Sequence, residues 1–218
     1  MHIEPGMLSA AKIVGADAAV LSLLASHAPA FLRRPQEWIK ALLAAAFFSV
    51  LMEVWHQPVG PSELHFIGAS AIYFIFGFRA TLFGFGIGLA LQGLLFEPQD
   101  LVHLAVNSLS LMVPLVAAHT MGGKRLLDAG GLTSIRWASV LRFDAVYYSG
   151  VVAMVGFWLM LGEEATPFVD WVVFAAAYLP VVLCEPAISC GLLRALGRLG
   201  AGNPLLRVTT LRSPALAR

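Results

Sequence analysis

Long apolar runs separated by short polar segments make up most of this sequence, up to about position 193. A helix needs about 20 apolar residues to cross roughly 30 Å of hydrocarbon. Lys12 and Asp17 interrupt the first run, and a tight turn at Gly77-Phe78-Arg79 joins the short third and fourth runs. The pattern predicts an all-α membrane protein of about seven transmembrane helices, at 8–31, 39–56, 64–78, 80–96, 101–121, 144–162 and 167–193.

The composition agrees with this prediction. Hydrophobic residues make up 59% of the 218 positions and charged residues only 12%, whereas a soluble domain is near half and a quarter. We expect residues 1–198 to form one transmembrane helical domain. Residues 199–218 are expected to form a flexible basic cytoplasmic tail near anionic lipid. The start of the chain carries Glu4 and lacks a basic segment, so we expect no cleaved signal peptide and a retained Met1.

Lys and Arg residues predict the orientation, because they are enriched in cytoplasmic loops. All of the 14 basic residues except Lys12 fall on one side of the predicted spans. The loops on the other side, at 57–63, 97–100 and 163–167, carry only acidic charges. We therefore expect a multi-pass protein of a bacterial or archaeal cytoplasmic membrane, with its N-terminus outside and its C-terminus in the cytoplasm. Membrane lipid is an expected partner and nucleic acid is not.

The N-terminus offers a metal chelate. The amine of Met1, the amide nitrogen of residue 2 and the imidazole of His2 can bind one metal ion through fused rings. A second imidazole could complete a square-planar site of four nitrogens, a geometry that favours Ni(II) or Cu(II). His65, at the outer start of the third span, is the natural fourth ligand, and His56 on the same side is its competitor.

Polar residues within apolar runs are further candidates, because their burial in lipid is costly. They are Glu53, Gln92, Asn107 and Glu185. Gln92 and Asn107 flank the acidic loop at 97–100 and could both point into an outward pocket. They could instead form hydrogen bonds between helices.

Small residues recur at a spacing of four in two spans. Ala41 and Ala45 form such a pair in the second span, and Gly84 and Gly88 in the fourth. This spacing lets helices approach closely. The stripe could seal the bundle internally or dock a partner membrane protein.

Three segments resemble the CbiM/NikM family, the metal-specific substrate-binding (S) components of energy-coupling factor transporters. They are Met1-His2-Ile3 with Gly6, the run Pro61-Ser62-Glu63-Leu64-His65-Phe66-Ile67-Gly68-Ala69, and the stretch from Gln92 through Phe96 to Asn107. The similarity is best in the first half of the chain. Glu97-Pro98-Gln99-Asp100 stands where the family usually has Gly-Asp-Gly-Gly.

The resemblance implies an S-component bundle with an added N-terminal helix. It also implies a Ni(II) or Co(II) ion held by Met1, His2 and His65, with Gln92 and Asn107 lining the pocket or supporting the ligands. Ala41 and Ala45 would match the small-residue face that meets the transmembrane coupling (T) component. No prosthetic group is implied, and a small accessory membrane subunit is a further partner.

The sequence contains no Gly-x-x-x-x-Gly-Lys-Ser/Thr motif, so energy for transport would come from separate ATP-binding cassette ATPases. We therefore expect a transport component and not an enzyme. Two alternatives remain at this stage. One is an intramembrane serine protease similar to rhomboids, with Ser70 in Gly68-Ala69-Ser70 as nucleophile, which would need a nearby histidine. The other is a scaffold or sensor without tight metal binding.

Overall fold

The structure is a computed structural model that describes residues 6–59, 62–128, 135–199 and 203–210. It confirms the all-α membrane fold. The elements are α1 (Ala10–Leu32), α2 (Pro35–Val54), β1 (His56–Val59), β2 (Ser62–His65), α3 (Ala69–Phe76), α4 (Phe78–Leu95), η1 (Pro98–His103), α5 (Leu104–Ala118), η2 (His119–Gly123), α6 (Lys124–Asp128), α7 (Trp137–Met160), α8 (Phe168–Ala177), α9 (Leu179–Gly197) and α10 (Pro204–Arg207).

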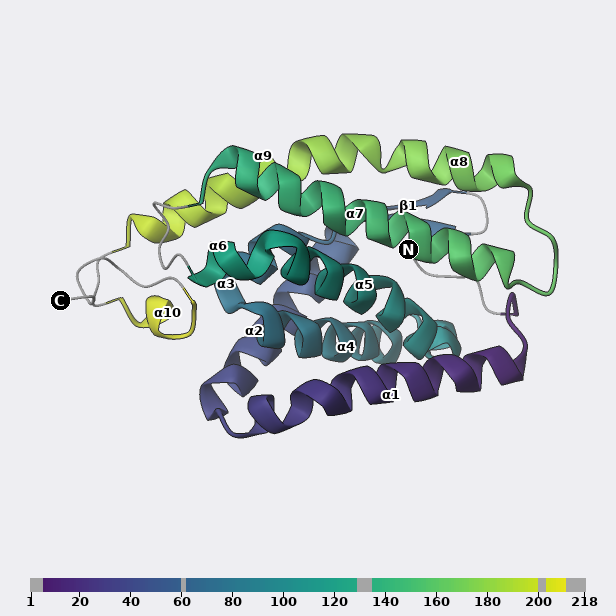
Figure 1. The fold of residues 1–218 in the computed structure, drawn as a ribbon, viewed down its shortest axis with the longest axis horizontal. Coiled ribbons are helices and arrows are strands. Elements are labelled where there is room, and N and C mark those ends of the chain that lie inside the picture. Colours follow the sequence, from purple (N-terminus) through teal and green to yellow (C-terminus); the bar gives the residue numbers. More distant parts are fainter. Residues whose placement is uncertain (1–5, 60–61, 129–134, 200–202, 211–218) are drawn as a thin grey trace.

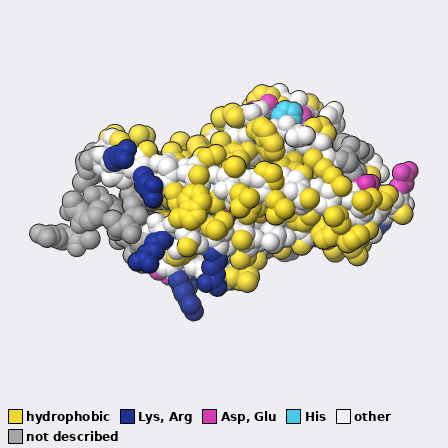
Figure 2. All heavy atoms as spheres, turned by 90° about the horizontal axis from the view of Figure 1, so that it is seen from above, with side chains coloured by type: hydrophobic (Ala, Val, Ile, Leu, Met, Phe, Trp, Pro, Cys, Tyr) yellow, Lys and Arg dark blue, Asp and Glu magenta, His cyan; other side chains and the backbone are white. Residues whose placement is uncertain are grey.

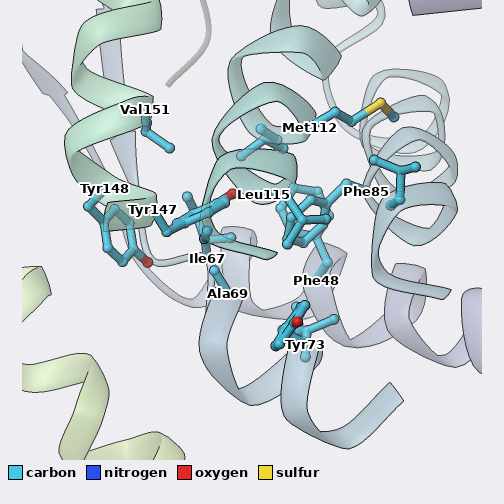
Figure 3. Packing of buried hydrophobic residues seen from close by; sticks show 14 of the residues in the cluster. Phe48, Ile67, Ala69, Tyr73, Phe85, Met112, Leu115, Tyr147, Tyr148 and Val151 are labelled. Carbon is cyan, nitrogen blue, oxygen red and sulfur yellow. The ribbon is translucent and has the colours of Figure 1, made fainter. Parts of the chain in front are cut away.

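The long helices lie along one another and form a single bundle (Figure 1). α2 packs on α4, α5 on α7 and α7 on α9, while α1 covers α4 and α5. The short α3 lies inside, with all eight residues buried. Figure 3 shows the centre of the core, where Phe48, Phe85 and Met112 meet from different helices.

Five stretches of the described residues are long and apolar enough to cross a membrane: 10–32, 78–95, 98–128, 137–160 and 168–197. They correspond to the predicted first, fourth, fifth, sixth and seventh spans. α2 has 20 residues but carries Glu37, Lys40 and Glu53. α3 has only eight residues, about 12 Å of helix, so it cannot cross a bilayer alone.

The predicted third span is wrong in its first part. Residues 64 and 65 belong to β2, which pairs antiparallel with β1 in a hairpin. Gly68 then adopts a left-handed conformation (φ +67°) that ends the extended chain and starts α3. Pairing in the hairpin satisfies backbone groups that would otherwise need a longer helix.

Two further boundaries differ from the prediction. α7 begins at Trp137 and not at 144, because the residues after Arg136 continue its helical pattern. The last predicted span is divided at Tyr178 into α8 and α9. Pro180, in the first turn of α9, lacks the N–H that would continue the α8 hydrogen bonds.

The described part of the predicted tail is packed against the bundle. α10 begins after Asn203, whose side chain caps it. Thr210 donates backbone and hydroxyl hydrogen bonds to the carbonyls of Ile75 (2.7 Å) and Phe74 (2.6 Å) at the end of α3. These bonds use carbonyls at the end of α3 that have no partner within the helix.

The small-residue stripe lies inside the bundle. Ala41 and Ala45 are fully buried on α2. A Cβ atom at Gly84 of α4 would lie 2.7 Å from the Cβ of Ala44 and 3.1 Å from the carbonyl oxygen of Ala41. This is the internal alternative for the stripe, and a partner cannot reach Ala41 or Ala45 while α2 and α4 stay packed.

The two ends of the bundle differ in charge. Figure 2 shows Lys and Arg at one end, an apolar belt, and Asp and Glu toward the other end. Among the described basic residues, Lys12 alone lies at the acidic end, where its Nζ is 2.5 Å from Glu163 and 2.6 Å from the carbonyl of Leu161. The ion pair with Glu163 thus accounts for a basic residue at the acidic end of the bundle.

Candidate metal site

A two-stranded hairpin at the acidic end of the bundle brings two histidines together. In its register His56 lies opposite His65, and their ring centroids are 5.9 Å apart. Glu63, two residues before His65, projects from the same face of β2. Its carboxylate lies 2.7 Å from His56 Nδ1 and 3.2 Å from His65 Nε2.

His65 is the buried member of this group. It is 2% exposed, whereas the side chain of His56 is half exposed. The Nδ1 atom of His65 lies 3.5 Å from the carbonyl oxygen of Met52 at the end of α2. The ring therefore contacts both α2 and the hairpin, which restricts its orientation.

A hollow of about 350 Å³ opens beside the two histidines, between the ends of α2 and α4. Gln92 of α4 is 2% exposed and donates a hydrogen bond to the carboxylate of Glu53 on α2. The hollow thus combines imidazole, carboxylate and amide groups in a space that can admit a small cation. Its lining residues are Met52, Glu53, His56, His65, Gln92, Leu95, Phe96 and Glu97.

The histidines keep the nearby carboxylate ionised. The pKa of Glu63 is lowered to about 2, chiefly by its interaction with the imidazole of His65. Partial burial acts in the opposite direction, and the imidazole of His56 lowers the pKa further. A negative charge is therefore present at the hairpin throughout the physiological pH range.

The structure brings some of the predicted site residues together. His65 and Gln92 line the hollow, and so do His56 and Glu53. Asn107 is buried on α5 but does not line it. Met1 and His2 lie outside the described residues. Within the part that is described, no three His, Cys, Asp or Glu side chains are arranged to hold a metal ion by themselves.

Two acidic residues of this region were missed in the sequence. Glu97 lines the hollow and Glu63 bridges the histidines. The signal for Glu63 is its spacing of two from His65, which places both on one face of a strand. That signal becomes readable only once residues 62–65 are recognised as a strand.

Ser70 lies in a different, buried polar cluster. Its hydroxyl donates to Asp144 (3.0 Å) and lies 2.8 Å from the hydroxyl of Ser189. Among the described residues, none of the recorded partners of Ser70 is a histidine. The recorded side-chain partners of the Ser70 hydroxyl are a carboxylate and a second hydroxyl, so the histidine that the protease alternative requires is not among them.

The fold and the hollow are those of a multi-pass helical membrane protein with a polar recess at one end of the bundle. Residues 2–201 match the CbiM family model, described as "Cobalt uptake substrate-specific transmembrane region". The chain belongs to this family, and it is a membrane component of metal uptake.

Two solved structures share the fold. One is described as a transition metal transporter (20% identity, TM-score 0.72, covering 95% of this chain and 96% of that one). The other is a truncated transition metal transporter (20% identity, TM-score 0.70, covering 90% and 98%). A search of curated proteins finds no match.

Proposed function

We propose that this chain is the substrate-specific membrane component of an energy-coupling factor importer, and that it captures Ni(II) or Co(II) at the hollow beside His65. The observation that carries the proposal is the buried His65 imidazole facing a carboxylate-lined hollow at the acidic end of the bundle. Imidazole is a ligand that suits nickel among the first-row transition metals.

The proposed ligand set joins His65 to the amine and amide of Met1 and His2. Its support is the coordination chemistry of an N-terminal Met-His sequence and the family membership. α1 starts at the same end of the bundle as the hairpin (Figure 1). Near this start the carbonyl of Met7 accepts a hydrogen bond of 2.9 Å from the N–H of Glu163, so the described beginning of the chain is fixed there.

Acidic residues around the hollow support cation capture. Glu53 and Glu97 line it, and the carboxylate of Glu63 contacts both histidine rings. Such charges raise the local concentration of a divalent cation and favour its binding. Gln92 orients Glu53 through its hydrogen bond.

We place the hollow on the outer face of the membrane. The support is the gathering of Lys and Arg at the opposite end (Figure 2), which is typical of the cytoplasmic side. Release of the metal inside would require reorientation of this chain, coupled through a T component to ATP hydrolysis by separate ATP-binding cassette ATPases. The chain itself contains no P-loop motif.

The proposal is tested by metal uptake in cells that express the chain with its cognate coupling subunits. Cellular nickel and cobalt are measured by mass spectrometry. We expect His65→Ala to abolish uptake. The matched control is His27→Ala, because His27 lies on α1 and packs edge-on against Phe78 at the basic end.

Uptake that is lost in His27→Ala as strongly as in His65→Ala would indicate a general folding defect. Full uptake by the His65→Ala variant would contradict the proposed site. A wild-type chain that transports neither metal would contradict the proposed function.

A further inference from the structure

The start of helix α3 lies in the interior of the bundle. Gly68, its N-terminal cap residue, has a left-handed conformation (φ +67°, ψ 32°) and no side chain that could cap the helix. The first N–H groups of a helix have no partner within it. In a membrane protein no bulk water replaces that partner. These groups therefore need an acceptor from another part of the chain.

The carboxylate of Glu185, on α9, is that acceptor. Its side chain is fully buried. Its Oε1 accepts a hydrogen bond from the backbone N–H of Ser70 at 3.2 Å, and the backbone of Gly68 and of Ala69 also bonds to the carboxylate. Glu185 thus caps α3 across 115 positions of sequence.

Two residues of helix α7 also form hydrogen bonds at the start of α3. The hydroxyl of Tyr148 donates to Glu185 Oε2, and the hydroxyl of Ser70 donates to Asp144. Figure 3 shows Tyr148 reaching from α7 toward the beginning of α3, near Ala69. The start of α3 is therefore fixed to both α7 and α9.

His65 is close to this anchored point. Only Phe66 and Ile67 separate it from Gly68, and Ile67 is fully buried. A Cβ atom at Gly68 would lie 2.3 Å from a methyl carbon of Leu51, so the connection is pressed against α2. With so short and tightly packed a link, a shift at the start of α3 must move His65.

We propose that Glu185 is a positioning residue for the metal site, which holds His65 in the hollow by capping α3. The inference rests on the proposed function, because that function gives His65 its role. Glu185 itself would not contact the metal. Removal of groups that orient a metal ligand weakens metal affinity by about 10- to 100-fold.

The test compares Co(II) binding to purified full-length variants in detergent. Dissociation constants are measured by calorimetry, and the visible absorption of bound Co(II) is recorded at saturation, because it reports ligand geometry. We expect Glu185→Ala to weaken binding at least about tenfold and to change the spectrum. Glu185→Gln keeps one acceptor oxygen, so we expect it to recover part of the affinity.

The matched control is a variant that loses a buried hydrogen bond between α5 and α7, away from the hollow. Ser110 is fully buried and accepts from Trp158 Nε1 at 3.0 Å. Ser110→Ala should lower the melting temperature and leave Co(II) affinity and spectrum unchanged. If Glu185→Ala fails to fold, the Glu185→Gln variant decides the test, since Gln keeps only one of the two acceptor oxygens that Ser70 and Tyr148 use and should still weaken binding.

Wild-type protein and His65→Ala are measured in the same series. If the wild type binds Co(II) and His65→Ala does not, while both Glu185 variants keep wild-type affinity and spectrum, the positioning role is wrong and the proposed function stands. If the wild type binds no metal, or His65→Ala binds as tightly, the proposed function fails and this inference fails with it.

Discussion

His56 and His65 stand opposite each other in the β1–β2 hairpin, and Glu63 lies within hydrogen-bonding reach of both imidazoles. The pair differs in burial, since His65 is enclosed and His56 is open to solvent. The ring of His65 is therefore held in one position beside the hollow, whereas the ring of His56 is half exposed to solvent. A ring that is already held in position is better suited to bind an incoming ion, which favours His65 over His56 as the metal ligand.

The acid stability of the protein should depend on the Glu63–His65 contact. Because the folded-state pKa of Glu63 is lowered to about 2, its contribution to stability is complete above the unfolded value near 4.5. That contribution is lost as pH falls from about 4.5 to about 2. His65→Ala removes the main cause of the lowered pKa, so this contribution should shrink. Melting temperatures recorded between pH 2 and 6 check the prediction.

Glu63→Gln is the control for this prediction, because it removes the titrating group itself. Its melting temperature should change less with pH between 4.5 and 2 than that of the wild type. An identical pH profile in wild type, Glu63→Gln and His65→Ala would show that the hairpin does not contribute.

The contact between α2 and α4 should tolerate no added side chain at Gly84. A Cβ atom there meets Ala44 at 2.7 Å and the backbone oxygen of Ala41 at 3.1 Å, so the helices must separate. We expect Gly84→Ala to destabilise the fold by about 1–3 kcal/mol, as overpacking does. Thermal unfolding of the purified protein measures the effect.

Gly15→Ala provides the comparison, because Gly15 lies on exposed α1 with open space around it. This substitution should leave the melting temperature unchanged or raise it, since alanine favours a helix. A Gly84→Ala variant as stable as Gly15→Ala would mean that α2 and α4 do not pack as closely as described.

The orientation can be tested with single cysteines at the two ends of the bundle. The native Cys184 and Cys190 are first replaced by alanine. A cysteine in place of exposed Glu164 should react with a membrane-impermeant maleimide added to intact cells, whereas one in place of exposed Arg198 should react only after lysis. The reverse pattern would place the hollow in the cytoplasm.

Much of the fold could be predicted from the apolar runs, because lipid requires about 20 apolar residues for each crossing helix. The hairpin could not be predicted from the sequence, since a segment that contains Pro58, Gly60 and Pro61 is typical of a loop. Both of its strands pack against α8, a helix far along the sequence, and no local pattern predicts that contact.

Several residues of the candidate site could be predicted from the sequence, but the contacts that those residues make could not. His65 was singled out by the N-terminal Met-His chelate, and Glu53 and Gln92 by their polarity within apolar runs. Glu185 was also singled out by polarity, but its partner Ser70 is 115 positions away, so its role as a cap needed the structure. The two alternatives for Ala41 and Ala45 differ only in what covers them, and that too is a matter of three-dimensional packing.

We propose that the chain's own N-terminus and His65 bind the metal together. The most direct test of this proposal is equilibrium binding of Ni(II) to purified protein at about pH 7.5, where the terminal amine and imidazole can lose their protons. Three forms are compared: the native N-terminus, a form with one residue added before Met1, and His65→Ala. We expect tight binding by the native form and strongly weakened binding by both variants. Undiminished affinity in both variants would contradict the proposal.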